Sequence, residues 1–275
     1  MSMEQIIEKY FRPGRLPHIW CPGCGNGIVL GAIAKAVDKV GLSKDDTSIV
    51  SGIGCSSRSS GYLDFNTVHT AHGRALTFAT GVKLAKPELN VIVCTGDGDA
   101  TAIGGNHFIH AARRNINLTV VLFNNNIYGM TGGQYSPLTP TNSKATTAPY
   151  GTIERSFDVC DLAKSAGATF VARGTTYHTQ ALVDVIAQGI QHEGFALIEV
   201  ITACPISYGR QNKKGDAPKM MQWQKEAGVM KAAFDKMTDE QRAGKFPIGV
   251  LHQETGVPEY TAAYEDVIKA AGGKK

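Results

Sequence analysis

Apolar residues recur along the chain in two alternating patterns. Short runs rich in β-branched residues predict strands at 47–54, 90–95, 117–126, 168–174 and 195–204. Between them, apolar spacing near 3.6 residues predicts helices at 28–40, 71–85, 105–115, 157–167 and 177–194. The strand runs are apolar at consecutive positions, which is typical of parallel strands buried on both faces. The alternation therefore predicts an α/β fold with a doubly wound, mostly parallel sheet.

This periodicity is interrupted twice. Residues 127–155 are rich in Gly, Pro, Thr and Ser and predict a long loop, a feature that is usually functional within a compact domain. After Cys204 the chain becomes polar, and residues 219–237 favour a single helix. We therefore predict a principal domain over residues 1–212 and a C-terminal extension, or arm, over 213–275.

Composition and charge narrow the class of protein. The chain is 43% hydrophobic and 19% charged, which is sufficient for a full core. Its net charge is +4 and its basic residues form no run of five or more, so a nucleic-acid partner is not expected. No signal peptide or membrane span is recognisable, which predicts a cytoplasmic protein without a membrane partner. In reducing cytosol, closely spaced cysteines favour metal or redox chemistry over structural disulfides.

The first candidate site follows the run at 90–95. Gly96 and Gly98 would let the backbone approach a phosphate closely. Asp97 stands between them and would repel a phosphate unless a cation lay between the two anions. The segment therefore indicates Mg²⁺ that bridges a carboxylate and a diphosphate. Thr101 occupies the place of the third glycine of a dinucleotide fingerprint, and no Walker A sequence follows.

A second candidate element ends the next apolar run. Asn124 and Asn125 offer neutral amide oxygens of the kind that hard cations accept. Parallel strands end at the same edge of a sheet, so this pair should lie beside Asp97. The order Gly-Asp-Gly, then 25 residues, then Asn-Asn resembles the thiamine diphosphate motif.

That resemblance implies a set of ligands. Mg²⁺ would be bound by Asp97, by the side chain of Asn125 and by the backbone carbonyl of Ile127. The diphosphate would be lined by Gly96, Gly98 and Asp99.

Four of the six cysteines follow predicted strands or lie in a glycine-rich loop: Cys21, Cys24, Cys55 and Cys204. Four thiolates among glycines suit a 4Fe–4S cluster, which needs room and backbone N–H donors. Zinc is the main alternative, although structural zinc sites usually show two CxxC-like pairs. A disulfide within the CxxC pair is a third possibility. Cys94 and Cys160 lie within predicted elements, and we expect them to be packing residues.

Six segments occur in an order that resembles a known family: WCPGCG, GIGCSS, HTAHGRALTFATGVKLA, GDGDATAIGGNH, NNNIYGMTGGQYSP and CPISYGR. They resemble the β subunit of 2-oxoacid:ferredoxin oxidoreductases over roughly residues 10–212, and most closely the bacterial enzymes acting on 2-oxoglutarate. The resemblance implies that the four cysteines ligate one 4Fe–4S cluster close to the thiamine cofactor.

The resemblance also implies a reaction and its partners. The reaction is oxidative decarboxylation of 2-oxoglutarate with CoA to succinyl-CoA and CO₂, or the reverse carboxylation, with ferredoxin as the electron partner. The chain has room for one thiamine-type domain, so an α subunit is expected to supply the pyrimidine-binding half and the activating Glu. The expected assembly is a dimer of αβ heterodimers.

Further side chains are candidates by their position. By the resemblance, we expect His72 to be catalytic through contact with substrate or cofactor, the alternative being a helix cap. We also expect Arg58 to be catalytic by pairing with an anionic substrate or CoA, the alternative being a surface arginine. Thr131 is expected to border the cofactor. Some relatives have Lys where Gly132 stands, so the distal carboxylate of 2-oxoglutarate would need a cation from elsewhere, such as the partner.

Three alternative functions remain open at this point. The substrate could be pyruvate or a branched-chain 2-oxoacid. The chain could be a subunit of a non-redox thiamine diphosphate decarboxylase, which would need no iron. It could also be an electron-transfer or zinc-stabilised assembly subunit, which would not bind thiamine diphosphate.

Overall fold

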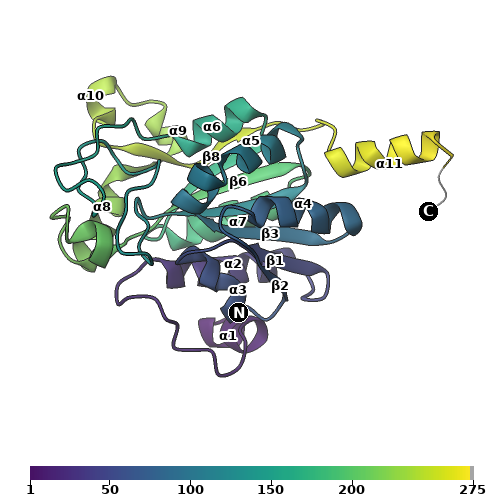
Figure 1. The fold of residues 1–275 in the computed structure, drawn as a ribbon, viewed down its shortest axis with the longest axis horizontal. Helices are drawn as coiled ribbons and strands as arrows, with labels where there is room; N and C mark the ends of the chain where they lie inside the picture. Colours follow the sequence, from purple (N-terminus) through teal and green to yellow (C-terminus); the bar gives the residue numbers. More distant parts are fainter. Residues whose placement is uncertain (273–275) are drawn as a thin grey trace.

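A central sheet of eight strands carries helices on both faces in the computed structural model, which describes residues 1–272 (Figure 1). The strands follow one another across the sheet in the order β2-β1-β3-β4-β6-β5-β8-β7. All pairings are parallel except the one between β5 and β8. The strands are β1 (Thr47–Ser51), β2 (Asn66–His69), β3 (Asn90–Gly96), β4 (Leu118–Asn124), β5 (Phe170–Thr175), β6 (Phe195–Ile201), β7 (Gly228–Met230) and β8 (Phe246–Gln253). The predicted doubly wound, mostly parallel α/β fold is confirmed.

The helices vary from single turns to fifteen residues. They are α1 (Met3–Tyr10), α2 (Asn26–Val40), α3 (Ser59–Tyr62), α4 (Ala75–Ala85), α5 (Gly105–Arg113), α6 (Val159–Ala166), α7 (Thr179–Gln191), α8 (Ala217–Ala227), α9 (Lys231–Phe234), α10 (Asp239–Arg242) and α11 (Tyr260–Ala270). A 3₁₀ turn covers Ser56–Arg58, and π-helical turns cover Asp99–Ile103 and Pro205–Gly209.

Two hydrophobic cores lie on the two faces of the sheet. Successive side chains of a strand point to opposite faces. In β3, Ile92 and Cys94 therefore join the core beneath α2 and α7, whereas Val91 and Val93 join the core beneath α4, α5 and α6. Because both faces are covered, the central strands carry apolar residues at consecutive positions.

A local signal explains where α2 ends, whereas a contact from a distant part of the chain sets the start of α4. α2 ends as expected at Gly41, whose left-handed backbone (φ 80°) lets its N–H reach the carbonyls of Val37 and Asp38. The helix predicted from residue 71 begins only at Ala75. The preceding turn is held by another contact, because the N–H of Gly73 donates to the carboxylate of Asp99 at 2.7 Å.

The C-terminal segment differs from its prediction. The single helix expected over 219–237 is wrong: α8 ends at Ala227, and Gly228, a poor helix former, adopts an extended backbone that starts β7. β8 then adds to the main sheet beside β5, and α11 projects from the body of the molecule (Figure 1). Part of the predicted extension thus belongs to the main sheet. The domain boundary at residue 212 stays a prediction.

Candidate functional site

A cleft opens where β3 and β4 end. Gly96 is paired with Phe123 in the parallel ladder, so the segments that follow the two strands lie side by side. The cleft encloses about 80 Å³ and is lined by residues 53–56, 96–99 and 127–131 together with His72, Phe123 and Asn125. A larger cavity of about 480 Å³ lies beside α8, but among the residues that the structure describes no carboxylate, histidine or cysteine lines it. We therefore place the chemistry in the smaller cleft, where both predicted loops meet.

Asp97 is a buried carboxyl group without a cation. It is 3% exposed, and its Oδ2 accepts a hydrogen bond from the Ser136 hydroxyl at 2.6 Å. Burial raises the pKa of Asp97 to about 7, although Ser136 and the backbone N–H groups of Gly98 and Ile127 act in the opposite sense. Among residues 1–272 no Lys, Arg or His forms an ion pair with it. A bound cation would supply the missing charge, so this carboxyl group suits a Mg²⁺ ligand.

Asn125 is buried next to this carboxyl group. Its Oδ1 accepts the N–H of Ile127 at 3.1 Å, which orients the amide at the start of the loop. Asp97, Asn125 and Ile127 all line the cleft, so the structure brings the three predicted metal ligands together.

Asp99 has a different environment from the one expected. Its carboxylate accepts hydrogen bonds from the Thr95 hydroxyl at 2.8 Å, from two backbone N–H groups and from Nδ1 of His72. A Cβ atom at Gly52 would lie 2.0 Å from Asp99 Oδ2, so the neighbouring loop must have glycine there. Asp99 lines the cleft but uses its carboxylate to hold the loops around it. Its direct contact with a diphosphate remains a prediction.

The Tyr128 side chain explains why residue 98 is a glycine. A Cβ atom at Gly98 would lie 2.1 Å from the Tyr128 ring, and the Tyr128 hydroxyl donates to the Gly98 carbonyl at 3.0 Å. Burial raises the pKa of Tyr128 to about 12, so the phenol stays protonated. Sequence reasoning missed both Tyr128 and Ser136, because neither belongs to the quoted Gly-Asp-Gly and Asn-Asn signals.

The four predicted cysteines converge at one side of the cleft. A Cβ atom at Gly129 would lie 3.4 Å from Cys55 Sγ and 3.7 Å from Cys204 Sγ. Burial raises the pKa of Cys24 to about 12, and the nearby Cys204, Cys55 and Cys21 raise it further. Burial likewise raises the pKa of Cys55 to about 11 and raises that of Cys204. These sulfurs are therefore close enough to influence one another.

Backbone N–H groups point at three of these sulfurs. Asn26 supplies one to Cys24, Met130 one to Cys55, and Ser207 and Tyr208 supply two to Cys204. Such donors stabilise thiolates that bind iron.

The spacing of the sulfurs bears on which metal they could hold. A single zinc ion with Zn–S bonds of about 2.3 Å would keep its sulfurs about 3.8 Å apart. Within residues 1–272, one triplet of His, Cys, Asp or Glu has all its ligand atoms within 4.8 Å, namely Asp158, Cys160 and Glu199. No three of the four converging cysteines meet this condition. As they are placed, no three of these sulfurs lie close enough to one another to share a single zinc ion.

Comparison with known proteins identifies the family of this chain. Residues 52–200 match the family described as thiamine pyrophosphate enzyme, C-terminal TPP binding domain. The 2-oxoglutarate synthase subunit KorB of Methanocaldococcus jannaschii is 54% identical over 88% of this chain and 89% of its own length. The KorB subunit of Archaeoglobus fulgidus is 60% identical over 74% of this chain and 76% of its own.

The chain belongs to the β-subunit family of the 2-oxoglutarate:ferredoxin oxidoreductases. A solved structure supports the assignment across the whole fold. The 2-oxoglutarate:ferredoxin oxidoreductase from Magnetococcus marinus, with 2-oxoglutarate, coenzyme A and succinyl-CoA bound, aligns with a TM-score of 0.85. It is 32% identical, and the alignment covers 100% of this chain and 92% of that chain. The fold class and the family expected from the motifs are thereby confirmed.

The remaining candidates of this β subunit lie in different places. His72 lines the cleft, where its ring and the Tyr128 ring form a T-shaped pair. Thr131 also lines the cleft, and its hydroxyl donates to Gln134 at 2.6 Å. Arg58 is exposed at the end of the 3₁₀ turn and does not line the cleft. The catalytic roles of His72 and Arg58 stay predictions.

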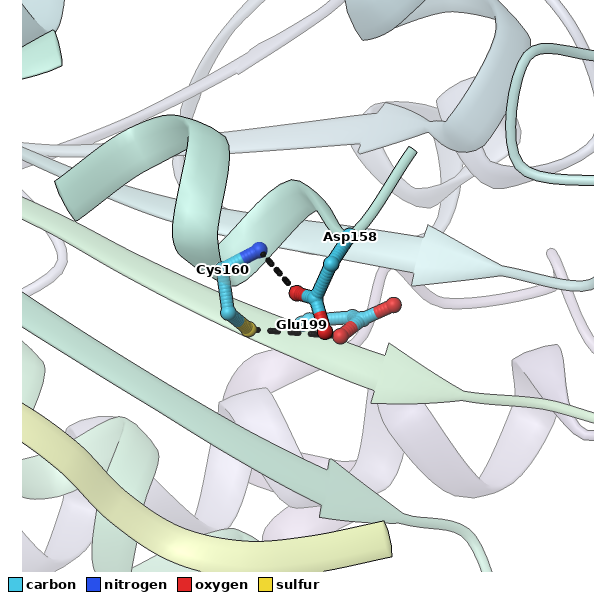
Figure 2. Close-up of side chains that lie close together, drawn as sticks. All are labelled: Asp158, Cys160 and Glu199. Carbon is cyan, nitrogen blue, oxygen red and sulfur yellow. Dashed lines mark hydrogen bonds between the residues drawn. The ribbon is translucent and has the colours of Figure 1, made fainter. Parts of the chain in front are cut away.

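The triplet Asp158, Cys160 and Glu199 is a structural cluster of the β subunit (Figure 2). Cys160 is buried as expected, and its thiol also donates to Glu199 at 3.3 Å. The Arg173 guanidinium already binds Glu199 at 2.5 Å and Asp158 at 2.8 Å, so both carboxylates have a cationic partner within the chain. Asp158 also caps α6 through the N–H groups of Cys160 and Asp161.

In the part of the chain that the structure describes, no helix has the length and apolar character of a bilayer span.

Proposed function

We propose that this β subunit holds Mg²⁺–thiamine diphosphate in the cleft and one 4Fe–4S cluster beside it. Mg²⁺ would bind Asp97, Asn125 and the Ile127 carbonyl, and Gly96 and Gly98 would lie against the diphosphate. The cluster would be held by Cys21, Cys24, Cys55 and Cys204. One observation carries the proposal: Gly129 lines the cleft and also lies against the sulfurs of Cys55 and Cys204.

The proposed reaction is oxidative decarboxylation of 2-oxoglutarate with CoA to succinyl-CoA and CO₂, or its reversal, with ferredoxin as the electron carrier. When bound, thiamine diphosphate supplies an electron sink for the carbanion that CO₂ leaves behind, and an iron–sulfur cluster accepts electrons singly. In this chain, Asp97 would fix the position of the metal, and the Tyr128 ring would close one side of the cleft.

A partner subunit would complete this site. The cleft contains two carboxylates, of which Asp97 is assigned to the metal and Asp99 is bound by four donors. Within residues 1–272, no carboxylate in the cleft is thus free to activate the cofactor, and no Lys or Arg lines the cleft to bind the substrate's distal carboxylate. We propose that an α subunit supplies the pyrimidine-binding half and the activating Glu, and that the assembly is a cytoplasmic dimer of αβ heterodimers.

The first test is the metal content of protein purified without oxygen. About four irons and four sulfides per chain, with an EPR signal after dithionite reduction, are expected. Zinc in their place, or intact thiols without metal, would remove the electron path and leave a non-redox thiamine enzyme. Turnover of 2-oxoglutarate, pyruvate and branched-chain 2-oxoacids by the assembled enzyme then decides the substrate.

A further inference from the structure

A basic surface adjoins the four cysteines. It comprises six exposed side chains: Lys144, Arg210, Lys213, Lys214, Lys219 and Lys225. None of the six forms an ion pair within residues 1–272. Lys144 and the segment 204–227 together contain only two acidic residues, so their net charge of +4 equals that of the whole chain. The positive charge of this protein is therefore concentrated here, and the remainder is balanced.

Covalent and packing contacts join this basic surface to the cysteines. Cys204 leads through the π-helical turn Pro205–Gly209 directly to Arg210. Gly23, inside the CxxC turn, packs against the start of α8, since a Cβ atom there would lie 2.4 Å from Ala217 Cβ. The backbone of Lys144 is bound to the side chain of Asn212 by hydrogen bonds of 2.7 and 2.9 Å.

This is also where the cysteine site reaches the surface. Cys21 is exposed, whereas Cys24, Cys55 and Cys204 are half-buried. α8 lies at the end of the molecule opposite α11 (Figure 1). Because Gly23 of the CxxC turn packs against Ala217, a protein that docks on α8 would lie near the exposed Cys21.

The positive charge of one of these lysines interacts unfavourably with the dipole of the helix that carries it. Asp216 caps α8 by accepting the N–H of Lys219 at 3.1 Å, which places Lys219 in the first turn. Acidic residues are favoured there because they interact well with the helix dipole, whereas a lysine is not. The positive charge of Lys219 therefore does not stabilise α8, and it is exposed to a partner.

Apolar side chains lie among these charges. Ile206 is 42% exposed and Trp223 is 48% exposed. Trp223 and Lys214 border the cavity of about 480 Å³. Aromatic and apolar residues surrounded by a charged rim are typical of a protein–protein interface.

We propose that this basic surface is the docking site for an acidic one-electron carrier protein, a ferredoxin. The inference rests on the proposed function, in which ferredoxin is the electron carrier of the enzyme. Each encounter would pass one electron from the reduced enzyme to one oxidised ferredoxin, so two ferredoxins are reduced for each 2-oxoacid oxidised. Complementary charge speeds such encounters without a large interface.

The test reverses charge on the surface in the assembled enzyme. Lys214→Glu with Lys219→Glu should lower kcat/KM for an acidic bacterial-type ferredoxin about tenfold at low salt and flatten its dependence on ionic strength. Binding of the same ferredoxin, measured by biolayer interferometry without substrate, should weaken in parallel. The second substitution places an acid where the helix favours one, so damage to α8 is not expected.

A matched control lies at the opposite edge of the sheet. Lys86→Glu with Lys164→Glu changes the charge equally at exposed lysines that lead into β3 and β5, and should leave ferredoxin kinetics unchanged. Reduction of methyl viologen by 2-oxoglutarate should be the same in all variants. If even the unmodified enzyme fails to reduce viologen, the proposed function is wrong, whereas unchanged ferredoxin binding by the Lys214/Lys219 variant overturns only the docking site.

Two further outcomes would overturn the docking site. One is a rise in KM for CoA with unaltered ferredoxin kinetics, which would make the surface a binding site for the nucleotide. The other comes from the unmodified enzyme, through carbodiimide cross-linking of its lysines to ferredoxin carboxylates. Cross-links are expected at Lys144, Lys213, Lys214 and Lys219, and cross-links confined to other lysines would contradict the proposal.

Discussion

Two buried carboxyl groups on the same sheet differ in how their charge is balanced. Asp97 follows β3 and Glu199 lies within β6, and each is 3% exposed. Glu199 accepts hydrogen bonds from Arg173 at 2.5 Å, Asn124 at 2.7 Å and Cys160 at 3.3 Å. Asp97 accepts from Ser136 and from backbone N–H groups and has no cation beside it in the described structure.

This difference separates a structural cluster from a ligand site. A buried charge that is paired within the chain needs nothing from outside, and its loss of a partner is costly. A buried carboxyl group without a cation instead shifts its pKa upward and remains open to an external cation. Burial alone does not distinguish the two, because the degree of burial is equal.

The largest expected effect comes from removing the Arg173 guanidinium, the cation of the structural cluster. Arg173→Met leaves Glu199 and Asp158 without their cation and should lower the free energy of unfolding by about 3–5 kcal/mol. Urea denaturation of the metal-free chain measures this. Arg114→Met, at an exposed position, is the control and should change it by about 0.5 kcal/mol or less. A loss below about 1 kcal/mol for Arg173→Met would mean that water, not Arg173, balances the cluster.

A second substitution tests the open carboxyl group. Asp97→Asn keeps the size of the side chain but removes the charge that would hold Mg²⁺. Mg²⁺-dependent binding of thiamine diphosphate, measured by calorimetry, should weaken about 100-fold, equivalent to about 2.7 kcal/mol. The free energy of unfolding of the metal-free variant at pH 8 should rise, opposite in sign to Arg173→Met. Unchanged cofactor affinity would remove Asp97 from the metal site.

The pH dependence follows from the raised pKa of Asp97. The folded protein holds this proton more tightly than the unfolded chain, so the resulting stability is complete below about pH 4 and is lost as pH rises through about 7. Because Mg²⁺ must displace the proton, Mg²⁺ affinity should rise about tenfold per pH unit up to about pH 7 and then level off. Titrations at pH 5, 6, 7 and 8 measure this, and a flat profile would contradict the pKa shift.

The smallest effect concerns the loops that surround the cleft. Thr95→Val removes one of the four hydrogen bonds to Asp99 and should cost about 1 kcal/mol of stability. Thermal unfolding measures the loss, and affinity for Mg²⁺–thiamine diphosphate should stay within about twofold, since Thr95 does not line the cleft. Loss of cofactor binding instead would show that Asp99 contacts the ligand directly.

The sequence predicted the parts whose signals are local. Gly41 ends α2 through its own backbone conformation, and the strands of the parallel sheet follow from consecutive apolar residues. The course of residues 71–74 could not be predicted in this way. It depends on Asp99, which is 26 residues away from Gly73 along the chain. The helix expected over 219–237 failed for a related reason, since Gly228 exchanges helical hydrogen bonds for pairing with β8.

The sequence by itself determined the α/β class, the two loops that meet in the cleft and which four cysteines to expect beside it. These could be inferred from position along the chain, because parallel strands end at the same edge of a sheet and bring the segments that follow them together. Only the tertiary structure decided which role each of two neighbouring side chains has. Asn124 donates to Glu199 in the structural cluster, whereas Asn125 lines the cleft. Adjacent residues at the end of a strand point to opposite faces of the sheet, and only the packed structure shows which side chains lie on each face.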